Sequence, residues 1–206
     1  VGMLLEEGFP SCTAWIVAAP DMIMTNAHCI PPGNNISDLQ VQFDYYCSTC
    51  TEGELVESRT FDVIELIVIN GGENSPIDFA VLRVDADVAS LYGQAVIDPN
   101  VQVKGQEIYE IHHAYGGPKG YDQGIVTNVD VNACQAHQNA VSVISAGGAS
   151  GSPVFNLADH CVSGVCSCGP ECGEGFLIPM AQIWPAAVSF IENAGGEVII
   201  CGEGCG

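Results

Sequence analysis

The sequence has few positive charges. Its 206 residues contain 4 Lys and Arg against 25 Asp and Glu, which gives a formal net charge of −21 at pH 7. Since 4 cations cannot neutralise a phosphate backbone, nucleic-acid binding through a basic face is excluded. Binding to an anionic membrane surface is disfavoured for the same reason. We therefore expect neither a nucleic acid nor a membrane as a partner.

The sequence also lacks long apolar runs. None approaches the ~18 residues that a membrane-spanning helix needs. The short apolar runs are separated by turn residues among the 24 Gly and 11 Pro, a spacing typical of an all-β barrel or sandwich. The expected strands cover residues 13–18, 22–25, 39–45, 61–69, 79–84, 106–112, 124–131, 140–145, 162–168 and 175–180. One helix is expected near the end, where Ile183, Ala187 and Ile191 recur at helical spacing.

Cysteine, by contrast, is abundant. Eleven Cys in a chain of this size indicate an oxidising compartment and several disulfides, and the odd number leaves at least one thiol over. The chain opens Val1-Gly2-Met3 without a signal peptide, so we expect the processed form of a secreted, extracellular or periplasmic protein.

Three separated segments carry residues that can act together in hydrolysis. His28 lies in Thr-Asn-Ala-His-Cys, Asp78 opens an apolar run, and Ser150 lies in Gly-Gly-Ala-Ser-Gly-Ser-Pro-Val. Amide hydrolysis needs a nucleophile, a base and a group that orients the base. Singly, each segment has a commoner interpretation: a structural histidine, a turn aspartate and a glycine-rich loop. Their joint occurrence in this order is far more specific.

These motifs resemble those of the chymotrypsin/trypsin-like serine endopeptidases, and within them the bacterial glutamyl-endopeptidase-like branch. Residues 25–29 are similar to the family's T-A-A-H-C element, and residues 77–82 to its D-I-A-L-L element. Ser-Gly-Ser-Pro-Val-Phe-Asn at 150–156 is similar to the bacterial branch. Residues 111–119 resemble its H-P-G-G-x-P-K loop, and 163–169 resemble the G-I-V-S-W-G strand. The resemblance covers about 12–193.

The resemblance implies an all-β fold of two six-stranded antiparallel β-barrels with a C-terminal helix. Residues 1–100 would form the first barrel, 101–194 the second barrel and the helix, and 195–206 a Cys/Gly-rich tail. Ser150 would be the nucleophile, His28 the general base and then acid, and Asp78 the group that orients His28. The N–H groups of Gly148 and Ser150 would form the oxyanion hole, an effect worth ~3–4 kcal/mol per donor.

The resemblance also implies a substrate-binding set. Ser167 and Gly169 would bind the substrate backbone, Ile144 would form the base of the primary specificity pocket, and Gly169 and Gly175 its walls. Ile144 carries no charge, which favours large apolar side chains. Lys or Arg ranks second, because Glu171 or Glu174 could turn inward. Glu ranks third: the branch uses a His where this chain has Cys166, although Ser145 matches a hydroxyl position of the same enzymes.

The family implies a Cys12–Cys29 disulfide. We further expect the pairs Cys168–Cys172, Cys134–Cys161 and Cys201–Cys205, with Cys166 as the remaining buried thiol. Cys47 and Cys50 can form a tight disulfide or donate two zinc ligands, and the cluster 161–172 could also bind zinc; the disulfide interpretation is favoured. No metal or cofactor is expected. The remaining histidines lack ligand spacing and are expected to be structural or on the surface: His112, His113, His137 and His160.

The sequence therefore predicts a secreted serine endopeptidase that is a monomer and acts on peptides or proteins through an acyl-enzyme on Ser150. The alternative is a catalytically silent, protease-like module that binds peptides. Hydrolysis of esters is a third possibility, because the same three residues perform both reactions.

Overall fold

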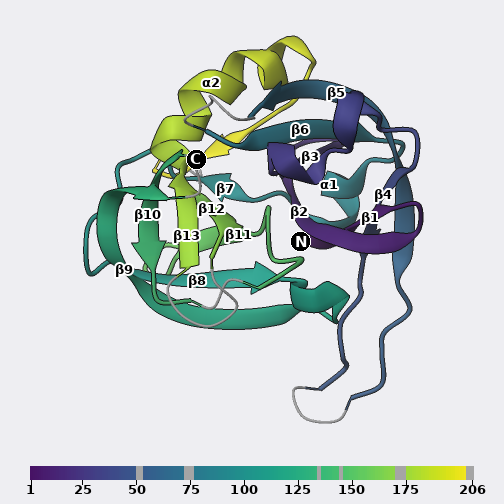
Figure 1. The fold of residues 1–206 in the computed structure, drawn as a ribbon. Coiled ribbons are helices and arrows are strands. Elements are labelled where there is room, and N and C mark those ends of the chain that lie inside the picture. Colours follow the sequence, from purple (N-terminus) through teal and green to yellow (C-terminus); the bar gives the residue numbers. More distant parts are fainter. Residues whose placement is uncertain (50–52, 72–76, 134–135, 144–145, 170–174, 203–206) are drawn as a thin grey trace.

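The computed structural model describes residues 1–49, 53–71, 77–133, 136–143, 146–169 and 175–202. Strands are the predominant regular secondary structure (Figure 1). The strands are β1 Gly2–Glu6, β2 Phe9–Ala18, β3 Met22–Thr25, β4 Leu39–Phe43, β5 Arg59–Asn70, β6 Phe79–Val84, β7 Val96–Ile97, β8 Glu107–His112, β9 Gly120–Ala133, β10 Ala136–Val141, β11 Pro153–Asn156, β12 Val162–Cys168, β13 Gly175–Pro179 and β14 Ile199–Ile200. The helices are α1 Val88–Tyr92 and α2 Met180–Asn193, with single 3₁₀ turns η1 Ala27–Cys29, η2 Pro32–Asn34 and η3 Ala114–Gly116.

The first six strands form a closed antiparallel barrel in the order β1-β2-β3-β6-β5-β4. Successive residues of β2 alternate between two apolar environments. Ala14 and Ile16 lie in the core of this barrel, whereas Trp15 and Val17 point out of it into a second core. Because both faces are buried, the strand is almost continuously apolar in sequence.

The second barrel is formed by β8 to β13. Its strands follow the order β11-β8-β9-β10-β13-β12, and the pairing of β11 with β12 closes it. The short strands β7 and β14 extend this sheet beyond β12 through parallel pairings. The predicted fold class, two six-stranded antiparallel β-barrels with a C-terminal helix, is confirmed.

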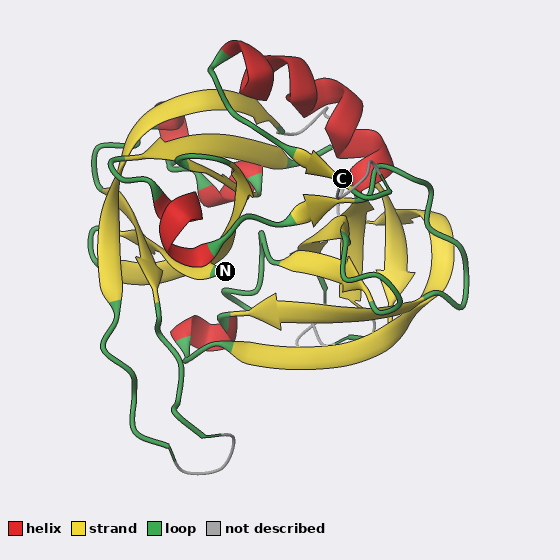
Figure 2. Cartoon of the chain, turned by 180° about the vertical axis from the view of Figure 1, so that it is seen from behind, coloured by secondary structure: helices red, strands yellow, loops and turns green. Residues whose placement is uncertain are grey.

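A hydrophobic core between the barrels joins them into one unit. It combines Trp15 and Val81 of the first barrel with Val165 and Ile178 of the second, and α2 covers it with Ile183, Ala187 and Ile191 (Figure 2). Arg83 on β6 adds a polar contact to this helix, since its guanidinium donates to the Ala194 carbonyl at 2.7 Å. Within the described ranges, neither helix is long and apolar enough to span a lipid bilayer.

The cysteines differ in part from expectation. Cys12 and Cys29 form the expected disulfide, but Cys161 pairs with Cys201, 40 residues away. The predicted pairs Cys134–Cys161 and Cys201–Cys205 are therefore wrong. The reason is β14, whose pairing with β7 brings the tail back to the second barrel and places Cys201 beside Cys161.

Two further cysteine predictions concern Cys47 and Cys168. Cys47 is an exposed free thiol, so the expected Cys47–Cys50 disulfide is wrong. Cys168 is disulfide-bonded, but Cys172 lies outside the described residues, and the Cys168–Cys172 pair stays a prediction. Cys166 is a buried thiol, as expected.

The expected boundaries at residues 100 and 194 stay a prediction. The first barrel ends with β6 at Val84, and β7 at 96–97 already belongs to the sheet of the second barrel. Within the segment 195–202, Glu197 bridges to Ala19 of the first barrel and Ile200 pairs with Ile97. This part of the tail is therefore built into the folded unit.

Candidate active site

His28 and Asp78 lie side by side in the first barrel. His28 is in η1, directly after β3, and Asp78 directly precedes β6. Because β3 and β6 pair antiparallel, with Thr25 opposite Ala80, both residues lie at the same end of the barrel. The His28 ring Nδ1 is 2.6 Å from Asp78 Oδ2, and the His28 backbone N–H donates to Oδ1 at 3.0 Å. The carboxylate thereby fixes both the ring and the backbone of the histidine.

Asp78 is held from several sides. The Asn26 amide donates to the Asp78 carbonyl at 2.8 Å, and the Ser167 hydroxyl lies 3.3 Å from Oδ2. Burial alone would raise the pKa of Asp78, but the hydrogen bonds and charge of His28 outweigh it, with help from the Ala27 N–H, and hold the pKa below its ordinary value. Asp78 is thus ionised at neutral pH and can keep the Nδ1 proton on His28.

A buried glutamine supports this arrangement. Gln138 on β10 is fully buried, and its amide nitrogen lies 3.3 Å from the Ser167 hydroxyl oxygen. The hydroxyl accepts that bond and is left with its proton for Asp78. Sequence reasoning missed Gln138, because an isolated Gln in a strand carries no local signal of function. It also assigned Ser167 only a backbone role.

Ser150 lies in the loop between β10 and β11 of the second barrel, and the first barrel holds that loop. Thr13 on β2 donates its N–H to the Ser150 carbonyl at 2.9 Å and its hydroxyl to the Gly148 carbonyl at 2.8 Å. Gly151 has φ +86, and a Cβ at this position would overlap the Thr13 carbonyl oxygen and the Thr25 hydroxyl. The close approach of the two barrels therefore requires glycine after the serine.

The Ser150 hydroxyl is directed to Ser167. It donates to the Ser167 carbonyl at 3.2 Å, and within the described part of the chain no hydrogen bond joins it to His28. Ser167 nonetheless contacts both halves of the site, because its hydroxyl faces Asp78 and its carbonyl faces Ser150. The predicted His28, Asp78 and Ser150 are thus gathered around one residue.

The backbone before Ser150 is oriented by η3. The Gly147 carbonyl accepts a hydrogen bond from the Tyr115 N–H. In a planar trans peptide the following N–H points the opposite way, so that of Gly148 is directed away from Tyr115. The N–H groups of Gly148 and Ser150 donate to no acceptor in the described residues. Both are left available to an external acceptor, as the predicted oxyanion hole needs.

The predicted substrate-binding residues are placed only in part. Ser167 is buried near the end of β12, Gly169 is exposed just after that strand, and Gly175 is buried at the start of β13. Ile144 and Ser145 lie outside the described residues, as do Glu171 and Glu174. The composition of the specificity pocket therefore stays a prediction.

The histidines next to this site have structural roles. His112 Nε2 lies 3.1 Å from Asp122, and its Nδ1 accepts the Ala114 N–H. His113 is buried, stacks on Tyr45 and donates from Nδ1 to the Gly117 carbonyl at 3.0 Å. Burial lowers the pKa of His113 to about 4, with a smaller contribution in the same direction from Lys119, so this ring is neutral at pH 7.

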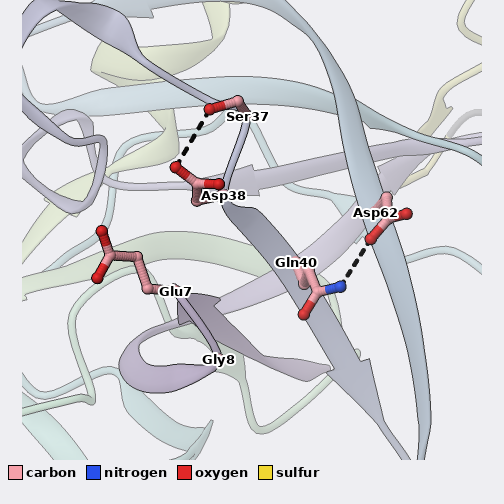
Figure 3. A pocket seen from close by; sticks show the side chains of 6 residues that line it. All are labelled: Glu7, Gly8, Ser37, Asp38, Gln40 and Asp62. Atoms are coloured by element: carbon pink, nitrogen blue, oxygen red, sulfur yellow. Dashed lines mark hydrogen bonds between the residues drawn. The ribbon is translucent and has the colours of Figure 1, made fainter.

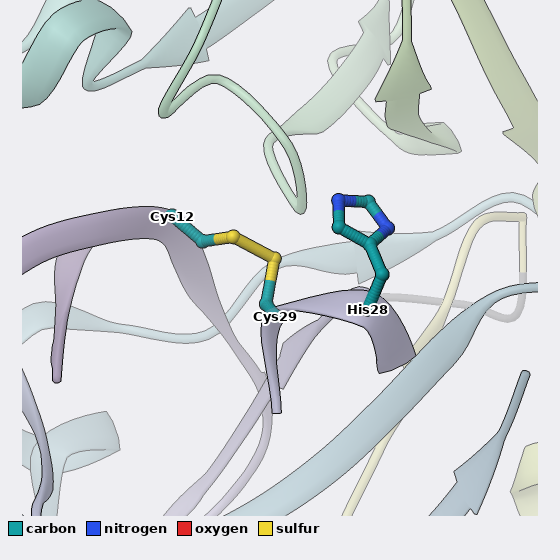
Figure 4. Close-up of side chains that lie close together, drawn as sticks. All are labelled: Cys12, His28 and Cys29. Carbon is teal, nitrogen blue, oxygen red and sulfur yellow. A yellow bond between two sulfur atoms is a disulfide. The ribbon is translucent and has the colours of Figure 1, made fainter. Parts of the chain in front are cut away.

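Two clusters bring potential metal ligands together, but disulfides account for their sulfur atoms. Cys12, His28 and Cys29 lie close to one another (Figure 4), with both cysteines in the disulfide and the His28 ring on Asp78. Asp159 lies beside the Cys161–Cys201 disulfide in the same way. Disulfide sulfurs are not thiolate ligands, so neither cluster fits a metal ion.

A separate acidic hollow lies on the first barrel (Figure 3). The Gln40 amide donates to Asp62 at 2.7 Å there, and the Ser37 hydroxyl to Asp38 at 3.2 Å. Its lining comprises Glu7, Gly8, Ser37, Asp38, Gln40 and Asp62. It shares no residue with the site around Ser167 and contributes nothing to it.

Comparisons with known proteins show which chains and folds this one is similar to. A curated relative, secreted RxLR effector protein 73 of Plasmopara viticola, is 25% identical over 180 residues, which are 82% of this chain and 44% of the relative. The chain thus spans less than half the length of that protein. Among solved structures, human heparin binding protein has a TM-score of 0.71 at 17% identity, covering 95% of this chain and 92% of that one. A Glu endopeptidase has a TM-score of 0.67 at 23% identity, covering 93% and 88%.

The family itself is identified by a sequence model. The model of the trypsin-like peptidase domain matches residues 12–165, a range that contains His28, Asp78 and Ser150. The structural similarities, all at low identity, support the same fold. The chain belongs to the trypsin-like peptidase domain family.

Proposed function

We propose that this protein is a serine endopeptidase in which Ser150 is the nucleophile, His28 the general base and Asp78 the residue that orients His28. The observation that carries the proposal is the double contact of Ser167, which joins ionised Asp78 to Ser150 while Asp78 holds the His28 ring at 2.6 Å. Through this convergence, the proposed nucleophile, base and orienting carboxylate can act on one substrate bond.

The reaction would follow from these positions. Rotation of the Ser150 side chain toward His28 Nε2 lets the imidazole take the hydroxyl proton as the oxygen attacks the peptide carbonyl. Asp78 stabilises the resulting imidazolium, and the N–H groups of Gly148 and Ser150 donate hydrogen bonds to the oxyanion. His28 then protonates the leaving amine, and water releases the acyl group from Ser150 by the same steps.

One observation favours a second candidate, a silent peptide-binding module. The Ser150 hydroxyl is bonded to Ser167 instead of His28, so the nucleophile is not activated in this arrangement. A fluorophosphonate probe separates the two candidates. Under the main proposal the folded protein gains the probe's mass on Ser150, and Ser150→Ala and His28→Ala do not. Folded protein without an adduct would favour the binding module.

We propose that the protein is functionally similar to the bacterial glutamyl-endopeptidase-like branch, but we expect a different preference for the residue before the cleaved bond. Large apolar residues before the cleaved bond rank first, Lys or Arg second and Glu third, because Cys166 is a thiol where the branch uses a histidine. Peptides that differ only at this residue test the ranking, and preferential cleavage after Glu would contradict it. Disulfides at Cys12 and Cys161, and a relative named as secreted, support an extracellular location.

A further inference from the structure

The second barrel encloses an acidic side chain that the reaction does not use. Glu110 lies on β8 and is fully buried. Its side chain points into the barrel, because alternate residues of a strand share a face and Ile108 and His112, two residues away on either side, are buried as well. Neither carboxyl oxygen has a well-aligned hydrogen-bond partner in the described residues. A buried carboxyl without a well-aligned hydrogen bond is costly and calls for an explanation.

The groups that face Glu110 lie next to the reacting residues. The Cys166 thiol and the Ser152 hydroxyl are close enough to the carboxyl to lower its pKa. Cys166 directly precedes Ser167, and its N–H and carbonyl bond the backbones of Ser152 and Gly151. Glu110 therefore faces one residue that lies two positions after Ser150 and another that directly precedes Ser167.

The Ser152 hydroxyl is already engaged in the turn around Ser150. It donates to the Ala149 carbonyl, which also accepts the Ser152 N–H at 3.0 Å. These two bonds close a four-residue turn with Ser150 inside it. The rest of the surroundings is apolar, with Val126, Val154 and Leu177 in the same core. Among the described residues, the donors that a carboxylate at Glu110 can gain are thus Ser152 and Cys166.

We propose that Glu110 is a positioning residue for Ser150: its protonated form leaves the Ser152 hydroxyl on the Ala149 carbonyl, and its ionisation draws that hydroxyl away and opens the turn. This inference rests on the proposed function. The proton leaves the Glu110 carboxyl for solvent, and the Ser152 O–H exchanges one acceptor for another. Apart from the O–H bond of the Glu110 carboxyl, no covalent bond of the protein changes.

Burial and the groups around Glu110 place its ionisation in the alkaline range. Burial raises the pKa of Glu110 to about 8, against the opposing effects of Cys166 and Ser152, and Asp122 on the paired strand β9 raises it further. Asp122 itself faces His112 at 3.1 Å. Glu110 is consequently protonated in neutral solution, and the ordered turn is the form present there.

The experiment follows Ser150 and the turn separately as pH rises. The rate of fluorophosphonate labelling at Ser150 is measured for the wild type, Glu110→Gln and the control Glu107→Gln, an exposed residue of the same strand. In the wild type and the control the rate falls above about pH 8, approaching tenfold per pH unit. In Glu110→Gln, which cannot ionise, this fall is absent. An identical alkaline fall in Glu110→Gln would overturn the proposal.

Hydrogen exchange at the Gly151 and Ser152 amides gives a readout that needs no activity. Protection of these amides, corrected for the intrinsic exchange rate at each pH, is lost in the wild type as the infrared carbonyl band of a protonated carboxyl disappears, whereas folded Glu110→Gln keeps its protection. Unchanged protection while that band disappears would refute the coupling, even if Glu110→Gln failed to fold. If the fluorophosphonate never labels Ser150 but amide protection is still lost as Glu110 ionises, only the proposed function is contradicted.

Discussion

Thr13 of the first barrel donates its backbone N–H to the carbonyl of Ser150 in the second barrel, at 2.9 Å. The same residue donates its hydroxyl to the Gly148 carbonyl and accepts the His113 N–H at 3.0 Å. One strand residue therefore fixes the loop on both sides of the proposed oxyanion hole. The position of Ser150 depends on the packing of the barrels as much as on its own loop.

Thr13→Val should weaken the site without unfolding the protein. Valine keeps the shape and the N–H bond to Ser150 but removes the hydroxyl, leaving the Gly148 carbonyl and the His113 N–H without a partner. The expected cost is ~1–3 kcal/mol in the ordering of the loop, seen as a tenfold or larger fall in fluorophosphonate labelling. Thr13→Ser retains the hydroxyl and should label at nearly the wild-type rate. Equal rates in both variants would show that the hydroxyl is unimportant.

Gly151→Ala should be far more damaging than an equivalent change elsewhere. Gly151 and Gly8 both have positive φ, +86 and +80, so alanine costs ~1–2 kcal/mol of backbone strain at either position. At Gly8 nothing lies within 4 Å of the added Cβ, whereas at Gly151 it meets Thr13 and Thr25. Thermal unfolding should show a small loss for Gly8→Ala and a much larger one for Gly151→Ala, together with loss of labelling. Similar losses in the two variants would contradict the close approach of the barrels.

Asp78→Asn should lower activity by roughly 10³–10⁴-fold while the fold is retained, because the amide no longer holds the reactive tautomer of His28. The carboxylate has a folded-state pKa below its ordinary 3.8, so its contribution to stability is present above that pH and is lost as pH falls through the lowered pKa. The stability difference between wild type and Asp78→Asn should therefore shrink in acid. A difference that grows below pH 3.8 would contradict this sign.

The Cys161–Cys201 bond can be tested by mass mapping of unreduced peptides. A cross-linked pair containing Cys161 and Cys201 is expected, with Cys47 alkylated without reduction. The bond closes 40 residues, for which chain entropy predicts a stabilisation of about 4 kcal/mol. Cys161→Ser with Cys201→Ser should lose a comparable amount, and Cys47→Ser should lose almost nothing. A mapped Cys134–Cys161 pair would contradict the structure.

Local motifs made the fold predictable and pointed to the residues that we propose react. His28, Asp78 and Ser150 each lie in a short segment that resembles a motif of the family. The spacing of the short strands indicated an all-β barrel or sandwich, and the resemblance implied two barrels. The residues around them carry no such signal. Thr13 and Gln138 act through partners more than 100 residues away or on another strand, and their roles follow from barrel packing alone.

In strand β8, hydropathy alone does not predict which side chains are buried. Its sequence Glu-Ile-Tyr-Glu-Ile-His would suggest that Ile111 faces inward, yet Glu110 is buried and Ile111 only partly so. The pairing of Glu110 with Val154 of β11 sets the register, and the period of two then fixes every other side chain. The same kind of long-range pairing, between β14 and β7, decided the partner of Cys161.

The hydrogen bond from Ser150 to the Ser167 carbonyl has a consequence for how the protein would recognise a peptide. On the proposed function, that carbonyl is also the acceptor for an N–H of the bound substrate backbone. The arriving N–H and the Ser150 hydroxyl compete for it, so a correctly seated peptide displaces the hydroxyl toward His28. Without a peptide, the Ser150 hydroxyl would stay hydrogen-bonded to the Ser167 carbonyl, and binding of the substrate would free it to approach His28. A peptide methylated at that nitrogen would bind more weakly. It would also fail to displace the Ser150 hydroxyl from the Ser167 carbonyl, so the nucleophile would stay turned away from His28.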